Sequence, residues 1–233
     1  MEALLTRENL RDPRYAVLTD FSSPSETLIV SFAGLGAGNN CPPFEFGGAL
    51  RNFDVKKALV RDPENYAYHG GLRGLSKDID QTAAYLRDLF KRSGATRIVT
   101  LGNCQGGYAA MLFGALAGAD ECVVFAPLTF LDSANRLLYG ETRWPEGFER
   151  IYTAPSPSPE YYDLCELDAL RELPITLYYD TTHPIDSQHS ERLLERFPHI
   201  QAERIEGGGH LFVLALKRRG HLNRILMGLC FGM

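Results

Sequence analysis

Short apolar runs alternate with amphipathic segments along most of the chain, a pattern typical of a largely parallel sheet covered by helices. The runs that predict strands are 15–18, 27–32, 53–60, 97–101, 121–125 and 175–179, and the more polar segment 201–205 is expected to be the last strand. Some segments have apolar residues at helical spacing and others are apolar on every side, and both patterns predict helices. These segments are 79–93, 108–113, 131–139, 187–196, 211–216 and 221–229. We expect run 15–18 at an edge of the sheet and Ser76 as the cap of the helix at 79–93. The order of elements predicts an α/β protein.

The most informative stretch is 95–117, in which a buried strand leads through a glycine turn into an apolar helix. Its turn, GNCQGG, has Cys104 at the centre of a Gly-x-Cys-x-Gly motif, which fits a nucleophile elbow. The flanking residues of such an elbow must be small because neighbouring backbone lies close. The N-terminus of a helix also favours thiolate over thiol. A buried cysteine in the glycine turn of another α/β protein is the alternative.

This motif is similar to the elbow of α/β-hydrolases, with cysteine at the position usual for serine, as in dienelactone hydrolases. Together with the segment YHGG at 68–71 and GGGH at 207–210, it resembles a little-characterised bacterial branch of that superfamily. The resemblance extends from about residue 27 to the end of the chain. It implies an α/β-hydrolase fold, a mostly parallel central sheet flanked by helices, with nucleophile, acid and base in that order.

The resemblance also implies positions for the base and the acid. His210, after the last strand and a glycine loop, stands where these enzymes have their general base. The acid follows strand 175–179, where Asp180 and Asp186 compete. Each aspartate also has a structural interpretation, Asp180 as the closure of a turn and Asp186 as a helix cap. A resemblance of residues 185–190 to an LDxxHA-like pattern favours Asp186, and both stay candidates.

Two backbone N–H groups are implied as the oxyanion hole, those of Leu35 and Gln105. Leu35 lies in the glycine-rich loop 33–38 after strand 27–32, and Gln105 follows the nucleophile. Ala33 stands where the family usually has histidine, a departure of small consequence because the donor belongs to the main chain. An ordinary glycine-rich loop would have the same sequence.

Substrate contacts are predicted from two further segments. In the glycine-rich stretch 66–75, His69 and Arg73 are candidates for binding an acidic part of a substrate, or for holding the loop in place. Residues 128–172 lack clear periodicity and are expected to form a lid-like insertion, as α/β-hydrolases often have at this point. Its aromatic residues, Trp144 among them, either line an acyl pocket or pack beneath long loops.

Length, composition and net charge limit the number of domains and the classes of partner that we expect for this protein. A chain of 233 residues, 45% hydrophobic, fits a single α/β domain over 1–233. Its net charge of −5 argues against nucleic acid and anionic membrane surfaces, so a small-molecule acyl substrate is the expected partner. No secretion signal or long apolar run is present, which predicts a cytoplasmic protein. The sequence does not tell which oligomeric state the protein adopts.

The remaining cysteines and histidines predict no further site. Five widely spaced cysteines without a CxxC pair are expected to be free thiols: Cys41, Cys104, Cys122, Cys165 and Cys230. We therefore expect no metal and no organic cofactor. Four histidines are interpreted as surface residues: His183, His189, His199 and His221.

These features predict a hydrolase, an esterase or thioesterase that works through Cys104, His210 and an aspartate by a covalent acyl-enzyme. A thioester intermediate also passes readily to amines, thiols or carbanions, so acyl transfer or cyclisation is an alternative. A non-catalytic ligand-binding protein of the same fold and a redox sensor that uses Cys104 are further hypotheses. A cysteine substituted for a natural serine would give the same motif with reduced turnover.

Overall fold

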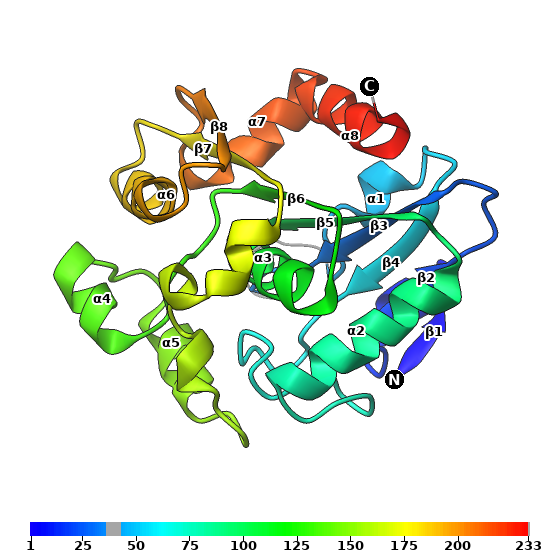
Figure 1. Cartoon of the computed structure of the whole chain (residues 1–233), viewed down its shortest axis with the longest axis horizontal. Coiled ribbons are helices and arrows are strands. Elements are labelled where there is room, and N and C mark those ends of the chain that lie inside the picture. The colour runs from blue at the N-terminus through cyan, green and yellow to red at the C-terminus, as the bar shows by residue number, and fades with distance from the viewer. Residues whose placement is uncertain (36–42, 233) are drawn as a thin grey trace.

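The computed structural model describes residues 1–35 and 43–232, and within them one eight-stranded sheet runs through the molecule (Figure 1). Its strands are β1 (Glu2–Leu4), β2 (Val17–Asp20), β3 (Thr27–Phe32), β4 (Lys56–Val60), β5 (Arg97–Asn103), β6 (Glu121–Phe125), β7 (Ile175–Asp180) and β8 (Gln201–Ile205). Their order is β1-β2-β4-β3-β5-β6-β7-β8. Only the β2–β4 pair is antiparallel among these described strands, which confirms the predicted mostly parallel sheet.

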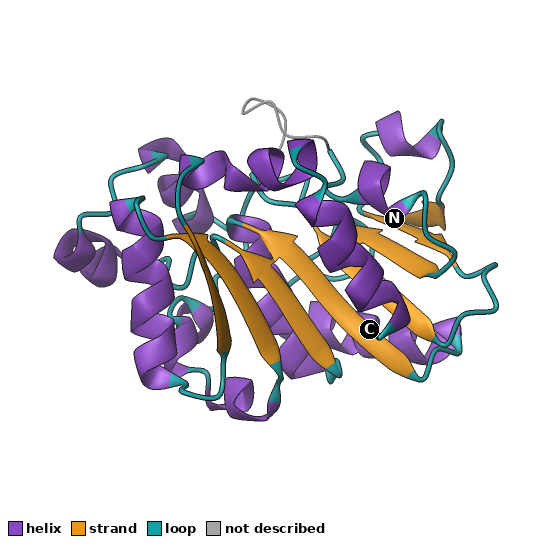
Figure 2. Ribbon diagram, turned by 90° about the horizontal axis from the view of Figure 1, so that it is seen from above, coloured by secondary structure: helices purple, strands orange, loops and turns teal. Residues whose placement is uncertain are grey.

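Helices cover both faces of the sheet (Figures 1 and 2). They are α1 (Gly47–Leu50), α2 (Ile79–Ser93), α3 (Gln105–Ala117), α4 (Ser133–Tyr139), α5 (Pro145–Tyr152), α6 (Pro184–Arg196), α7 (Phe212–Arg218) and α8 (His221–Phe231). Short 3₁₀ turns lie at Asn9–Arg11, Pro159–Tyr161, Leu164–Glu166, Asp168–Glu172 and Gly209–Leu211. Apolar side chains of α2, α3 and α6 join the core on one face, and those of α1, α7 and α8 join it on the other.

Strand β3 illustrates why the central strands are continuous apolar runs. All six of its residues are buried. Successive side chains point to opposite faces, so Leu28 and Val30 join the core under α2 and α3, whereas Ile29 joins the core under α7 and α8. Helix α3 follows the same logic, since nearly all of its residues are buried, as its apolar sequence predicts.

Two details of the predicted elements are wrong. Run 15–18 is not at an edge, because β1 pairs with β2 on its outer side. The cap of α2 is Asp78, whose carboxylate accepts a hydrogen bond of 2.7 Å from the N–H of Gln81. Asp78 directly precedes the first helical residue, whereas the hydroxyl of Ser76 accepts from the N–H of Leu72.

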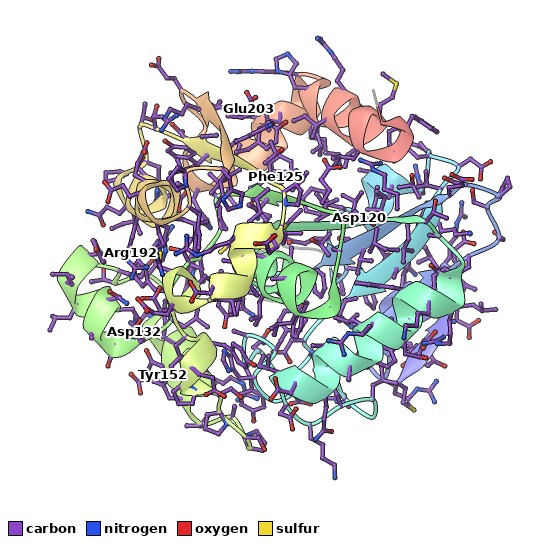
Figure 3. The ribbon with its side chains drawn as sticks, in the orientation of Figure 1. Asp120, Phe125, Asp132, Tyr152, Arg192 and Glu203 are labelled. Carbon is purple, nitrogen blue, oxygen red and sulfur yellow. The ribbon has the colours of Figure 1, made fainter. Side chains whose placement is uncertain are left out.

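The insertion 128–172, which lies within the connection from β6 to β7, carries α4, α5 and three of the 3₁₀ turns. Arg192 of α6 anchors it through two short hydrogen bonds to Asp163, of 2.7 and 2.5 Å. Figure 3 shows Asp132 and Tyr152 of this connection on the same side of the molecule as Arg192. Its function as a lid stays a prediction.

Three expectations from the sequence can be compared with the structure only over the residues that it describes. Across 1–35 and 43–232, no helix is long and apolar enough to cross a membrane. Four cysteines in these ranges are free thiols, Cys104, Cys122, Cys165 and Cys230, and Cys41 lies outside them. Residues 36–38 of the predicted oxyanion loop also lie outside the described residues.

Candidate active site

Cys104 lies in the sharp turn between β5 and α3, as the sequence predicts. Its backbone has φ 54° and ψ −120°, a conformation that is strained for a residue with a side chain. Two hydrogen bonds hold it there: its N–H donates to the carbonyl of Phe125 at 2.9 Å, and its carbonyl accepts from the N–H of Leu128 at 3.1 Å. Strand β6 and the residues after it therefore fix the position of Cys104.

The glycines on both sides of Cys104 permit this turn. A Cβ atom at Gly102 would lie 2.0 Å from the carbonyl oxygen of Gly106, and one at Gly106 would lie 2.3 Å from the carbonyl oxygen of Phe32. Both contacts are with backbone atoms, which cannot move aside as a flexible side chain would. The elbow motif is thus a steric requirement of close packing between β3, β5 and α3.

We predict that Gly106→Ala lowers the free energy of unfolding by about 1–3 kcal/mol or more, since the added methyl group overpacks a rigid site. Gly48→Ala is the matched control, because a Cβ at Gly48 meets no atom within 4 Å. Urea unfolding at one pH measures both variants. Equal stability of the two variants would contradict the steric role of Gly106.

The thiol of Cys104 is shielded from solvent, with 6% of the residue exposed. Burial raises its pKa above the ordinary value of 9.0, and the smaller opposing effects of Arg143 and the N–H of Gln105 do not reverse this. Cys104 is therefore a neutral thiol near pH 7. This differs from the expected thiolate because loss of hydration outweighs the favourable helix N-terminus.

The raised pKa of Cys104 predicts the sign of a pH effect on stability. Because the folded chain holds this proton more tightly than the unfolded chain, the contribution is complete below about pH 9 and is lost as the pH rises above it. Above pH 9, wild type should lose up to about 1.4 kcal/mol per pH unit more than Cys104→Ala. Urea unfolding between pH 8 and 10.5 under reducing conditions measures the difference. Parallel curves for the two proteins would contradict it.

The two predicted oxyanion residues, Leu35 and Gln105, border one small hollow. Its free volume is about 10 Å³, and its wall also includes Trp144, Phe148 and Ile151. The residue before Leu35 is held in place, because the N–H of Gly34 donates to the buried carboxylate of Glu45 at 3.1 Å. A small, largely apolar space therefore lies directly beside the residue that follows Cys104.

His210 contacts Asp186. Its Nδ1 lies 2.9 and 3.0 Å from the two carboxylate oxygens. Asp186 is 1% exposed and occupies the first turn of α6, and the cap of that helix is His183. Burial opposes ionisation of Asp186, but the hydrogen bond from His210 and the positive charge of Arg143 outweigh it and lower its pKa. The carboxylate is therefore charged and orients the imidazole.

Asp180, the other candidate acid, has a different set of partners. Its carboxylate accepts hydrogen bonds from the N–H of Gly207 at 3.1 Å and from the N–H of Gly209 at 2.7 Å. It also accepts from the N–H and the hydroxyl of Thr182. Asp180 thus binds the glycine loop that precedes His210 and fixes the position of the histidine indirectly.

His69 and Arg73, the two candidates for substrate binding in the stretch 66–75, have different partners. His69 is fully buried, with its Nε2 3.0 Å from the hydroxyl of Tyr108, and burial lowers its pKa to about 3. Arg73 is exposed and forms an ion pair with Glu64. His69 thus joins the stretch 66–75 to α3, and Arg73 joins it to Glu64, contacts that are compatible with holding this loop in place. A contact of either residue with substrate stays a prediction.

Trp144, by contrast, lies beside the candidate base. Its ring centroid is 5.1 Å from that of His210, and it borders the hollow next to Gln105. Trp144 directly precedes α5, so the insertion 128–172 supplies one wall of the site. The predicted contact of Trp144 with substrate stays a prediction, and its position is compatible with it.

Three charged or polar residues form a chain of contacts that begins at Asp186, and of these only His189 belongs to a sequence pattern, the LDxxHA-like segment 185–190. Arg143 contacts Asp186, Glu141 contacts Arg143, and His189 contacts Glu141. The interpretation of His189 as a surface residue is wrong, because the insertion covers α6 and leaves His189 0% exposed. Among the described residues, no group of three or more potential ligands could hold a metal ion.

Comparison with known proteins identifies similar structures but no similar sequence. No protein-family model and no curated protein matches the chain. The capsule O-acetyltransferase of Neisseria meningitidis serogroup A matches with a TM-score of 0.67 and 15% identity, over 91% of this chain and 90% of that one. A structure from work on carboxylesterases of the thaumarchaeon Nitrososphaera gargenis matches with a TM-score of 0.56 and 14% identity, over 91% of both chains.

A third similar structure is MGS-M2, an α/β-hydrolase enzyme from a Medee basin deep-sea metagenome library. It matches with a TM-score of 0.59 and 11% identity, over 93% of this chain and 94% of that one. All three likenesses extend over nine tenths of the chain. At identities this low they concern the fold alone.

Proposed function

We propose that this chain, which has the α/β-hydrolase fold, is an enzyme that takes an acyl group from an ester or thioester onto Cys104 and passes it to an acceptor. The conformation of Cys104 carries the proposal. A strained residue between two obligatory glycines is costly to maintain, and such strain is concentrated at functional sites. A non-catalytic binding protein has no need of it.

In the first half-reaction His210 acts as general base. Its Nδ1–H donates to Asp186, so Nε2 is the nitrogen with a free electron pair. Nε2 takes the proton from the thiol of Cys104, and the sulfur attacks the carbonyl carbon as the C=O double bond opens to an oxyanion. The backbone N–H groups of Leu35 and Gln105 are proposed to stabilise that oxyanion. Asp186 stabilises the imidazolium that forms.

Collapse of the tetrahedral intermediate breaks the bond to the leaving alcohol or thiol, which receives the proton from His210. The acyl group then remains on Cys104 as a thioester. In the second half-reaction His210 deprotonates the acceptor, which attacks the thioester carbonyl, and the sulfur leaves and recovers the proton. Water as the acceptor gives hydrolysis, whereas an alcohol or amine gives acyl transfer.

The small hollow beside Gln105 favours a short acyl chain. Its wall is formed mainly by Leu35, Leu128, Trp144 and Phe148, and its free volume of about 10 Å³ is room for about one water molecule. A group as small as acetyl is the substrate class that this space favours. A long fatty acyl chain would need the wall to move.

Transfer rather than hydrolysis is the second candidate, and one observation favours it. The O-acetyltransferase of Neisseria meningitidis has the same fold, and a histidine-to-alanine variant of it has been solved in complex with CoA, with a TM-score of 0.63 to this chain. Acetyl-CoA is therefore a suitable donor to test beside simple esters. An acyl-cysteine that is slow to hydrolyse would serve such a transfer.

The test is to incubate the protein with p-nitrophenyl acetate, p-nitrophenyl butyrate or acetyl-CoA and to weigh the intact chain by mass spectrometry. We expect an acetyl or butyryl adduct that maps to Cys104 and is absent from Cys104→Ala. Cys122→Ala is the matched control, since Cys122 is also fully buried but lies within β6.

Release of more than one equivalent of p-nitrophenol would identify a hydrolase, and a stalled adduct would identify a transferase that lacks its acceptor. No adduct from any of the three donors would contradict the acyl-enzyme. Oxidation of Cys104 by low doses of peroxide, without any acyl adduct, would instead support redox sensing.

A further inference from the structure

Arg143, which belongs to the insertion, reaches both polar partners of the candidate site. Its Nη1 donates to Asp186 Oδ1 at 2.7 Å and lies 3.1 Å from Nδ1 of His210. Its side chain is 18% exposed. Since Nδ1 of His210 donates to the same carboxylate, Asp186 Oδ1 is shared by two donors from different parts of the fold.

Glu141 in turn fixes Arg143. The Nε of Arg143 lies 3.1 and 3.0 Å from the two carboxylate oxygens of Glu141, whose side chain is fully buried. Burial alone would raise the pKa of Glu141, but hydrogen bonds from His189 and Arg143 lower it to about 2. Glu141 is therefore ionised, and the guanidinium lies between two buried carboxylates.

His189 completes the chain as a neutral donor. The N–H of Thr129 donates to His189 Nδ1 at 3.0 Å, so the ring proton is on Nε2, which donates to Glu141 at 3.2 Å. Burial lowers the pKa of His189 and keeps the ring neutral. Thr129, His189 and Glu141 thus form a continuous support that ends at Arg143.

The charges in this network add to a defined sum next to His210. Glu141 and Asp186 contribute −1 each and Arg143 contributes +1, so the sum is −1. Two further titratable groups near His210 are His183, whose ring centroid is 5.8 Å from that of His210 and whose Nδ1 is 3.3 Å from Asp186 Oδ2, and Asp180, which accepts from the N–H of Gly209, and both are the same in every variant compared. Removing the charge of Arg143 or that of Glu141 therefore changes how strongly the network stabilises the His210 imidazolium, and the two changes have opposite signs.

We propose that Arg143 is a positioning residue for the reaction. It holds Asp186 and His210 in their relative orientation, is itself held by Glu141, and links the insertion to the acid and base. The kinetic part of this proposal rests on the proposed function. The electrostatic part concerns His210 alone and needs no substrate.

The experiment is an NMR titration of the His210 ring in the intact protein, with the signal assigned by its loss in His210→Gln. In Arg143→Met the sum becomes −2, so the titration midpoint should rise, by roughly one pH unit or more for a charge this close. In Glu141→Gln the sum becomes zero, so the midpoint should fall. Arg143→Lys keeps the charge and should leave the midpoint within a few tenths of a unit of wild type.

Opposite shifts in the two charge variants would support the proposal, because a loss of packing alone would not give opposite signs. Shifts in the same direction, no shift in either variant, or an Arg143→Lys midpoint as far displaced as that of Arg143→Met would overturn it. Circular dichroism on each sample verifies that the variant is folded.

Kinetics with p-nitrophenyl acetate separate this proposal from the proposed function. We expect Arg143→Met to lower kcat roughly 10- to 100-fold with little change in KM, by analogy with the residues that orient metal ligands through hydrogen bonds, and Arg143→Lys to recover part of the loss. A wild type that forms no acyl adduct while the midpoints shift as described would refute the enzyme and leave the network established. A fall confined to KM would overturn the positioning role.

Discussion

Replacing His210 by alanine should lower acyl turnover by about 10²- to 10⁴-fold, the range that a general base contributes in other enzymes. The expected loss is large because burial raises the pKa of Cys104, so the resting nucleophile is a thiol that needs a base to remove its proton. A cysteine that was already ionised would depend much less on the histidine. Initial rates with p-nitrophenyl acetate measure the effect.

The control for this variant is His221→Ala. His221 is an exposed histidine at the start of α8, and its replacement should leave the rate unchanged. Acyl-adduct formation on Cys104 should also slow in His210→Ala, because the base acts before the covalent bond forms. Wild-type rates in His210→Ala would remove the histidine from the mechanism, and a protein that fails to fold would appear as lost cooperativity in urea unfolding.

The fold could be predicted from the sequence to a large extent, for a simple physical reason. Strands buried on both faces are continuous apolar runs, and the predicted runs 27–32 and 121–125 coincide with β3 and β6. The three-residue β1 was not predicted, because Glu2–Leu4 is too short for a periodic pattern and gains its place by pairing with β2. The cap of α2 differs from the prediction because several polar residues precede that helix, and the sequence alone does not show which of them accepts from its first turn.

The candidate site was predictable where local steric demands leave a trace in the sequence. Cys104 is marked by glycines that its own turn requires, and His210 by the glycine loop that precedes it. The contact of Asp186 with His210 joins residues 24 positions apart, and the sequence could not decide between Asp186 and Asp180. Nothing in the spacing distinguishes an aspartate that contacts the imidazole from one that binds the loop.

Arg143 and Glu141 left no such trace, and the LDxxHA-like segment that contains His189 did not indicate its contact with them. Its contacts join residues 43 and 48 positions apart, from Arg143 to Asp186 and from Glu141 to His189, and each depends on how the insertion packs on α6. The insertion lacks periodicity, so its packing could not be derived from the sequence. His189 shows the consequence: its helix face is polar in the sequence, and the insertion buries it.

The two aspartates should respond in opposite ways to replacement by asparagine, and this comparison assigns the acid. In Asp186→Asn the neutral amide neither stabilises the imidazolium nor enforces Nδ1–H, so turnover should fall by roughly 10²- to 10⁴-fold, as for other triad acids. In Asp180→Asn an amide NH₂ group replaces one oxygen that accepts from Thr182, Gly207 or Gly209, so the main effect should be a loss of stability of about 1–3 kcal/mol.

Rates with p-nitrophenyl acetate and urea unfolding of the same preparations measure both quantities. A rate loss in Asp186→Asn without a comparable loss of stability identifies Asp186 as the acid. The reverse result, with Asp180→Asn folded and nearly inactive and Asp186→Asn near wild type, would exchange the two roles. Since the charge on Asp186 also binds Arg143, the Asp186→Asn variant loses part of the link between the insertion and His210. If neither variant lowers the rate, the acid of the reaction lies elsewhere, and the hydrogen bond between Asp186 and His210 has only a structural role.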